Sequence, residues 1–176
     1  MKNAFGVCLI TLLIISSCAK ENATPSYGVF SFEKSLSLPG TCDEIYGAIT
    51  GDISGWWDHS FSKKPYRFYI EAKPGGGFYE IFDESGDGIL HATVIGADRG
   101  KLLRFEGPLG LAGRAVTVVT TYMFEANGTD STTLKVVVHS SGEIDASLAS
   151  IVENVWDHFI FERFKPYIEK GEHLSR

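Results

Sequence analysis

The stretch 148–168 constrains the fold of this chain more than any other feature, because it has the period of a long amphipathic helix. Pro166 lies near its end and predicts a kink or a stop there. A helix with so wide an apolar face must be buried, and a sheet is the only large apolar surface that this chain offers. The apolar positions are Leu148, Val152, Val155, Phe159, Ile160 and Phe164, and the polar positions between them are Glu153, Asn154, Asp157, His158 and Glu162.

Strand patterns fill most of the chain ahead of that helix. Residues 29–38 alternate apolar and polar side chains and end at Pro39-Gly40. Thr41 and Glu44 then have the spacing of a capping box, which predicts a short helix over 41–50. Six further strands, paired as consecutive hairpins, imply one antiparallel sheet and an α+β fold. Their predicted ranges are 66–72, 78–82, 89–95, 102–105, 116–124 and 132–138.

The N-terminus has the features of an export signal. After Lys2, an apolar run of about a dozen residues is too short to span a bilayer core of about 30 Å and is typical of a signal peptide. Ile15-Ser16-Ser17-Cys18 resembles the bacterial lipobox. That resemblance implies a lipid on the Cys18 sulfur and cleavage before Cys18. An ordinary secretory signal, or an N-terminal anchor with a chance cysteine, remains the alternative.

These features predict a domain plan and a location. We expect a lipoprotein signal peptide at 1–17, a lipid-anchored tether at 18–27, one folded domain at 28–170 and a C-terminal tail at 171–176. The protein would be exported to the cell envelope and held to a membrane through Cys18. Ala19 after that cysteine, in place of Asp, favours the outer membrane if the cell is Gram-negative.

Composition excludes several classes of protein. The net charge of -6 argues against a nucleic-acid partner, because phosphate binding needs a basic surface. Cys42 is the one cysteine after position 18, so the domain has no disulfide framework. No nucleophile elbow, phosphate loop, dinucleotide fingerprint or zinc-like spacing occurs. We therefore expect no metal and no cofactor.

The order of these elements resembles the START-like, or Bet v 1-like, SRPBCC superfamily over about 29–167. Within it, the branch related to activators of the Hsp90 ATPase is the most similar. The resemblance implies a helix-grip fold, in which a curved antiparallel sheet of about seven strands surrounds a long C-terminal helix, with short helices after strand one. It also implies an internal cavity for apolar molecules. The segments that carry it are 36–39, Gly55-Trp56-Trp57, 71–80, 102–108 and Trp156.

Large aromatic side chains are the candidate walls of that cavity, since pockets for apolar ligands are lined in this way. Ordinary core packing is the alternative for each of them. The candidate ligand-binding residues are Trp56, Trp57, Phe68, Tyr79, Phe82, Tyr122, Trp156 and Phe159.

Ionisable residues in the strands have two interpretations. His91 lies on the same strand face as Thr93, and His139 lies on the same face as Lys135. These polar neighbours predict that both histidines face solvent, although either could be a general base. Five further side chains read either as exposed cross-strand pairs or as groups that polarise a carbonyl: Arg67, Tyr69, Glu71, Arg104 and Glu106. Residues 107–113 form a glycine-rich apolar loop that could be a lid, a membrane contact or a connection packed on the core.

We therefore expect an envelope lipoprotein that binds a small apolar ligand, lipid-like or aromatic, in an internal cavity. An enzyme of the cyclase, dehydratase or hydrolase kind is the first alternative, and it would need His91, Arg104, Glu106 or Arg114 to point inward. A protein-interaction module related to chaperone activators is a further alternative. Chaperone binding is not expected, because that chaperone is cytosolic and the leader exports this chain.

Overall fold

The computed structural model describes residues 26–175. The predicted signal peptide, Cys18 and nearly all of the tether lie outside the described residues. Eight strands form one antiparallel sheet in the order β1-β8-β7-β6-β5-β4-β3-β2. The strands are β1 (Tyr27–Pro39), β2 (Gly51–Asp52), β3 (Arg67–Ile70), β4 (Gly77–Ile81), β5 (Gly88–Asp98), β6 (Leu102–Gly107), β7 (Val116–Ala126) and β8 (Ser131–Glu143).

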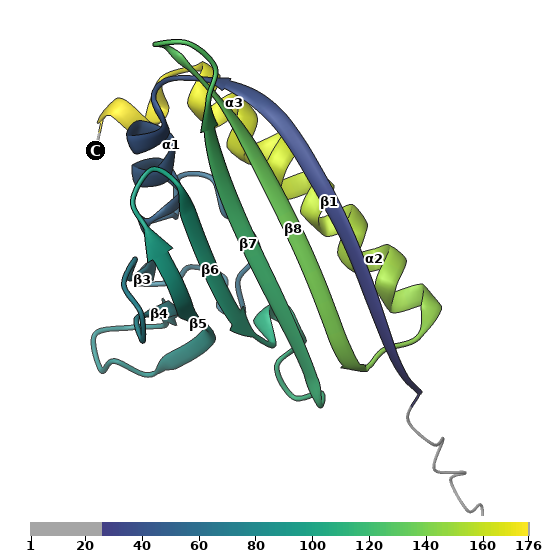
Figure 1. Cartoon of the computed structure of the whole chain (residues 1–176). Helices are drawn as coiled ribbons and strands as arrows, with labels where there is room; N and C mark the ends of the chain where they lie inside the picture. The colour runs from purple at the N-terminus through teal and green to yellow at the C-terminus, as the bar shows by residue number, and fades with distance from the viewer. Residues whose placement is uncertain (1–25, 176) are drawn as a thin grey trace, which may run out of the picture.

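The helical elements are α1 (Cys42–Ile49), η1 (Leu109–Leu111), α2 (Ala146–Asp157), η2 (His158–Phe164), α3 (Lys165–Glu169) and η3 (Glu172–Ser175). Figure 1 shows α2 and α3 lying in one line behind the curved sheet and running along β1 and β8. The predicted α+β helix-grip class is confirmed, with the two-residue β2 as one strand more than expected. Within residues 26–175, no helix is both long enough and apolar enough to cross a membrane.

The short helix α1 begins where its capping box predicts. The Thr41 hydroxyl accepts the Glu44 backbone N–H at 3.3 Å, and the Thr41 N–H donates to the Glu44 carboxylate at 2.7 Å. Two backbone donors that the helix leaves unpaired are therefore satisfied.

The C-terminal helix passes through Pro166 without the predicted stop. The chain stays helical to Glu169, because the turn before the proline is π-helical over η2. There the Lys165 N–H donates to the Ile160 carbonyl, five residues back. A proline ring clashes with the carbonyl four residues before it in a regular α-helix, and the wider turn removes that conflict.

The core consists of two hydrophobic clusters of unequal size. The larger is aromatic and surrounds Trp56, which is 4.8 Å from Phe164 between ring centroids and donates its indole N–H to the Ala48 carbonyl. The smaller contains Val116, Ile144 and Leu148 and lies under the start of α2. Both clusters lie within the described residues, so the domain from Ser26 onward contains its own core.

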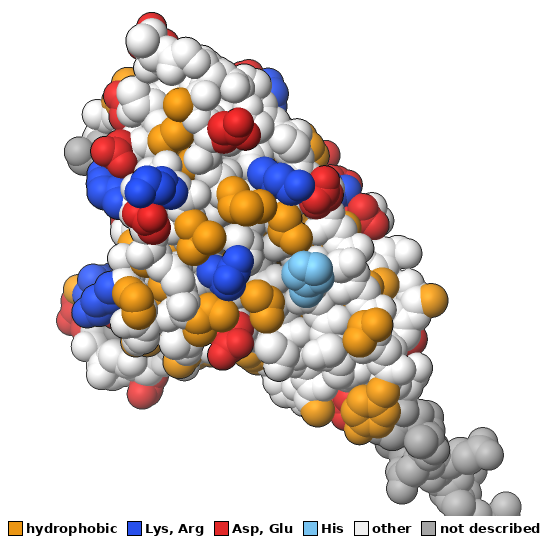
Figure 2. All heavy atoms as spheres, in the orientation of Figure 1, with side chains coloured by type: hydrophobic (Ala, Val, Ile, Leu, Met, Phe, Trp, Pro, Cys, Tyr) orange, Lys and Arg blue, Asp and Glu red, His pale blue; other side chains and the backbone are white. Residues whose placement is uncertain are grey.

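The outer face of the sheet carries charged and hydrophobic side chains together, as Figure 2 shows. His139, Arg104 and Glu106 are exposed there, as the alternation predicted. The Arg104 guanidinium donates to the Thr121 hydroxyl at 2.8 Å. On the opposite face, Lys34 of β1 forms ion pairs with Glu153 and Asp157 of α2 and so connects the sheet to the helix.

Candidate functional site

A pocket of about 480 Å³ opens between the two hydrophobic clusters. Its walls come from α2, the loop 57–61, the η1 segment and the inner face of the sheet. Ile151 and Phe61 lie at the rim, where their side chains remain 56% and 49% exposed. The lining residues are Trp57, Asp58, His59, Ser60, Phe61, His91, Pro108, Leu109, Gly110, Leu111, Val118, Leu148, Ile151, Val152, Val155, Trp156 and Phe159.

Three of the eight aromatic candidates, Trp57, Trp156 and Phe159, line this pocket. Trp57 and Phe159 stack with 3.8 Å between ring centroids, which forms a flat aromatic wall. Trp56, Phe68 and Tyr122 are buried in the core behind the lining residues and do not line the pocket, and burial raises the pKa of the Tyr122 phenol. Tyr79 and Phe82 are only half-buried and lie outside the pocket.

The place of Tyr79 follows from strand alternation. Its neighbours Phe78 and Glu80 point inward and are fully buried, so Tyr79 points to the outer face. There its ring lies 5.2 Å from that of Tyr69, and Arg67 lies over the Tyr69 ring. Aromatic character alone did not distinguish the two faces of β4.

Aliphatic side chains of α2 form much of the pocket wall, although the sequence analysis named only aromatic residues as candidate ligand-binding residues. Leu148, Val152 and Val155 belong to the predicted apolar stripe, and all three line the pocket. The stripe does not fill the concave side of the sheet at this end, because these side chains are smaller than the aromatic ones further along the helix.

The glycine-rich loop forms another wall. Pro108, Leu109, Gly110 and Leu111 all line the pocket, and Leu109 is buried. The backbone of Leu109 has φ 51°, a left-handed conformation that is costly for a residue with a side chain. Leu109 therefore packs on the interior beside the pocket, whereas Gly110, Ala112 and Gly113 of the same loop are exposed.

His91 is the one sheet histidine whose predicted direction was wrong. It is buried, with 4% of its surface exposed, and lines the pocket. The cause is a β-bulge: Phe78 pairs with Ala92 and Tyr79 pairs with Leu90, so His91 is left between paired positions. An extra residue in one strand turns a side chain to the other face, and His91 and Ala92 both point inward.

Glu80 is the inward partner of His91 and was not predicted. The Glu80 carboxylate accepts the backbone N–H groups of Phe61 and Ser62 at 2.9 and 2.7 Å. His91 Nε2 lies 3.1 Å from Glu80 Oε2. Burial alone would raise the pKa of Glu80, but these hydrogen bonds outweigh it and hold the pKa below its ordinary value.

The Glu80 contact also determines which nitrogen of His91 carries a hydrogen. An ionised carboxylate only accepts hydrogen bonds, so Nε2 donates to it. Within residues 26–175, Nδ1 of His91 then has no hydrogen-bond partner. The inner wall of the pocket thus contains one oriented imidazole among mainly apolar side chains.

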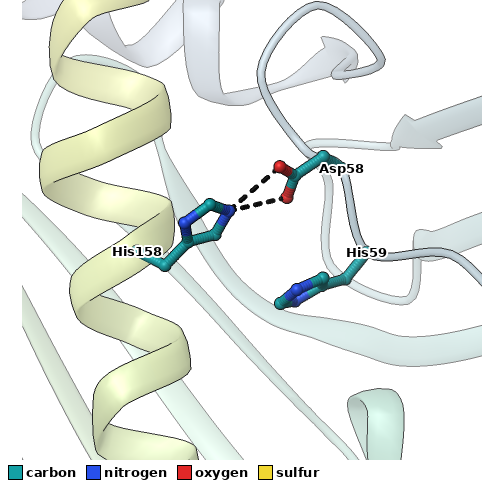
Figure 3. A group of neighbouring side chains, drawn as sticks. All are labelled: Asp58, His59 and His158. Carbon is teal, nitrogen blue, oxygen red and sulfur yellow. Dashed lines mark hydrogen bonds and ion pairs between the residues drawn. The ribbon is translucent and has the colours of Figure 1, made fainter.

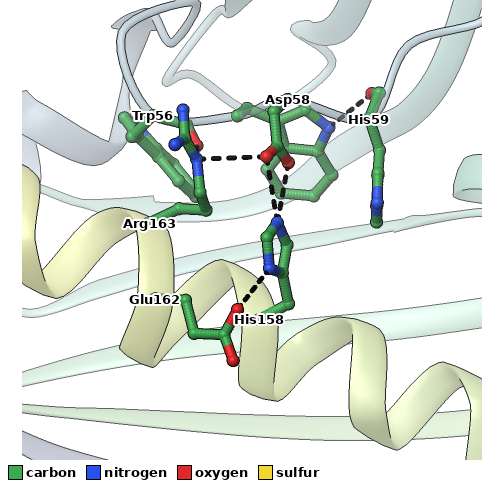
Figure 4. Close-up of polar contacts among 7 residues, drawn as sticks. Trp56, Asp58, His59, His158, Glu162 and Arg163 are labelled. Atoms are coloured by element: carbon green, nitrogen blue, oxygen red, sulfur yellow. Dashed lines mark hydrogen bonds and ion pairs between the residues drawn. The ribbon is translucent and has the colours of Figure 1, made fainter.

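A second polar group lies at the pocket mouth, where η2 meets the loop 57–61 (Figure 3). His158 Nε2 is 2.9 Å from Asp58 Oδ2, and His158 Nδ1 is 2.8 Å from Glu162 Oε2. Arg163 Nε lies 3.1 Å from the same Asp58 oxygen (Figure 4). The Glu162 carboxylate, then that of Asp58, stabilises the imidazolium and raises the pKa of His158 above its ordinary value.

Of the other candidate acid–base groups, Arg104, Glu106 and Arg114 are exposed. Only His91, among those four, reaches the pocket.

Comparisons with known proteins identify the fold. The sequence matches no protein-family model and no curated protein. An uncharacterized protein from Rhizobium leguminosarum superposes with a TM-score of 0.59 at 14% identity, over 84% of this chain and 99% of that one. Ara h 8.0201 gives a TM-score of 0.57 at 17% identity, over 81% and 99%.

Norcoclaurine synthase from Thalictrum flavum gives a TM-score of 0.51 at 14% identity, over 85% of this chain and 99% of that chain. Its structure contains a transition-state analogue. Identities this low establish the fold and nothing finer. The described part of the chain therefore has the helix-grip fold of Bet v 1-like proteins.

Proposed function

We propose that this protein is an envelope lipoprotein that binds a small apolar ligand in the pocket between α2, η1 and the sheet. The observation that carries the proposal is the pocket itself, which has a volume of about 480 Å³ and a largely apolar lining. Ligand sites in proteins are commonly about 300–1,000 Å³, mostly apolar, with a few placed polar groups. His91 is such a group here.

The chemistry of the wall indicates the class of ligand. The stacked Trp57 and Phe159 rings offer a flat apolar surface, and the α2 side chains offer an aliphatic one. Because His91 Nε2 donates to Glu80, its Nδ1 can accept a hydrogen bond from one hydroxyl or N–H group. A planar or lipid-like molecule with a single polar group matches this combination.

A filling substitution tests the pocket. Val152→Trp places a large ring in the space, whereas Val29→Trp makes the same change at a side chain that is 80% exposed on β1. The fluorescent probe 8-anilinonaphthalene-1-sulfonate would be titrated into the domain from Ser26 onward. We expect the wild type and Val29→Trp to bind the probe alike and Val152→Trp to bind it at least tenfold more weakly.

Equal probe binding by all three proteins would refute the assignment of the pocket. Thermal unfolding of each variant shows whether it is folded. Native mass spectrometry of the protein purified from its own host would then identify the species that the pocket retains.

Lipid anchoring at Cys18 is part of the proposal. β1 starts at Tyr27, so a tether from Cys18 would reach at most about 30 Å. The domain would then lie close to the membrane from which it could receive an apolar ligand. Cys18→Ala should abolish labelling by radioactive palmitate and release the protein from the membrane fraction, and unchanged labelling would contradict the anchor. Fractionation of inner and outer membranes tests the location that Ala19 favours.

The buried dyad of Glu80 and His91 favours an enzyme as the second candidate. A carboxylate that fixes one imidazole nitrogen leaves the other free to accept a proton from a bound molecule. Molecules recovered from the wild type and from His91→Gln would be compared by mass. A species converted by the wild type but retained unchanged by His91→Gln supports catalysis, and identical contents support binding alone. The finer resemblance to chaperone activators remains a prediction that a pull-down would test.

A further inference from the structure

The group at the pocket mouth contains the donor types of a transition-metal site. Asp58, His59 and His158 each offer one ligand atom, and these three atoms lie within 4.8 Å of one another. Figure 3 shows His158 projecting from the helix toward the loop that carries Asp58 and His59. Two imidazoles and one carboxylate form the donor set of several open zinc and iron sites.

His158 is oriented as a metal-ligating histidine usually is. Its Nδ1 lies 2.8 Å from the Glu162 carboxylate, one helical turn along η2. A carboxylate on the far nitrogen fixes the ring and directs the other nitrogen toward the metal. Here that other nitrogen, Nε2, points at both oxygens of Asp58, 3.1 and 2.9 Å away.

These spacings suit a bound ion. Donors about 2.0–2.2 Å from a tetrahedral zinc ion lie roughly 3.3 Å from each other. The Asp58 and His158 atoms already have nearly this separation. The His59 ligand atom lies within 4.8 Å of the other two, and its side chain is exposed, so rotation about its side-chain bonds can shorten that distance.

An ordinary ion-pair cluster that joins the loop to the helix is the competing interpretation. It accounts for Asp58, His158 and Arg163, which pair directly (Figure 4). It assigns no polar role to His59, whose ring packs edge-on against Phe159 at 4.8 Å, lies beside the His158 ring at 5.4 Å and has no hydrogen bond within residues 26–175. Two imidazoles beside one carboxylate are the arrangement that a shared cation would use.

We propose that Asp58, His59 and His158 bind a divalent transition-metal ion of the zinc class at the mouth of the pocket, with Glu162 as the residue that positions His158. Three protein ligands leave at least one coordination position open. Asp58 and His59 line the pocket, so that position can take water or the polar group of a molecule held in the pocket. The site goes beyond the proposed apolar binding and does not depend on it.

Sequence spacing could not predict this site. Asp58 lies 100 positions before His158 and His59 is the residue after Asp58, so the fold alone brings the three together.

Isothermal titration of the domain from Ser26 onward with zinc chloride tests the proposal. The wild type should bind one Zn²⁺ per chain with saturation at micromolar concentrations. Co²⁺ in its place should give visible absorption bands of a low-coordinate nitrogen and oxygen site. Because the titration needs no pocket ligand, its result is independent of the probe-binding experiment.

Two donor variants, one variant of the positioning residue and one control test the site. His59→Ala and His158→Gln should each weaken zinc binding at least tenfold, and Glu162→Gln should weaken it about ten- to a hundredfold through the orientation of His158. His139→Ala removes an exposed histidine on the outer face and serves as the matched control, with unchanged affinity. Thermal unfolding in the presence of a chelator shows that each variant is folded.

Arg163→Gln distinguishes a metal site from a purely structural ion-pair cluster. The guanidinium competes with a cation for Asp58, so its removal should strengthen zinc binding severalfold. Zinc binding that is absent in the wild type, or equal in the wild type and in His59→Ala, would overturn the proposal.

Discussion

Replacement of Glu80 by glutamine isolates the contribution of the buried carboxylate beneath the pocket. Glu80 has no exposed surface and receives three donors: two backbone N–H groups from the loop 61–62 and the imidazole of His91. Glutamine has nearly the same size but only one acceptor oxygen. Its amide NH₂ must face one of those donors, which then stays unpaired.

The expected loss of unfolding free energy follows from these hydrogen bonds. A buried donor left without a partner costs about 1–3 kcal/mol, and the remaining bonds weaken because they lose the charge of the acceptor. The lowered pKa of Glu80 shows that its hydrogen bonds more than offset the cost of burying the charge. We therefore expect Glu80→Gln to lose about 2–4 kcal/mol of unfolding free energy, or about 5–15 °C in melting temperature for a domain of this size.

Urea unfolding at a series of pH values tests both the size of the stability loss and the direction in which it changes with pH. A lowered pKa in the folded state means that the carboxylate stabilises the fold above the ordinary glutamate value of about 4.3. This contribution disappears as the pH falls through the lowered pKa, so the difference between wild type and variant should shrink below about pH 4. Glu106→Gln, at an exposed carboxylate on β6, should change little at any pH. A loss in Glu80→Gln no larger than in Glu106→Gln, or one independent of pH, would refute this reasoning.

Three further substitutions have calculable outcomes. Lys34→Met removes two ion pairs to acidic residues of α2, each 2.9 Å long, and should cost about 1 kcal/mol in urea unfolding at neutral pH, because those partners are partly exposed. Thr41→Ala removes the cap of α1 and should cost about 1 kcal/mol, with a smaller loss if Glu44 is already replaced by alanine. Gly142→Ala should cost more than about 2 kcal/mol in melting experiments, since its new Cβ would lie 2.1 Å from the Ala115 carbonyl at a φ of 131°.

The architecture could be predicted from the sequence because its signals are periodic and repeated. The apolar stripe of 148–168 and the alternation in the long strands each extend over many residues, so one exception does not hide the pattern. The capping box at Thr41 is short, but its pair of residues at a fixed spacing is specific, and the structure confirms it. β2 was missed because a strand of two residues is too short to show an alternation of apolar and polar side chains.

The site was less predictable because it depends on departures from those patterns. Strict alternation placed His91 on the solvent side, and one bulged residue reverses that direction. Glu80 looked like an ordinary strand carboxylate, because the loop donors that hold it lie 18 and 19 positions away. His59 and His158 meet only once the helix has packed on the sheet, so no local pattern in the sequence connects them.

The pairing of β1 with β8 has a consequence for the order in which the chain can fold. The first strand finds its neighbour about 100 residues later, and among the strands that the structure describes β1 pairs with β8 alone. During synthesis, the earliest segment must therefore wait for nearly the whole domain, whereas each hairpin between β3 and β8 can close as it emerges. Closure of this long loop should set the folding rate, and a chain that ends before Ser131 would leave β1 unpaired.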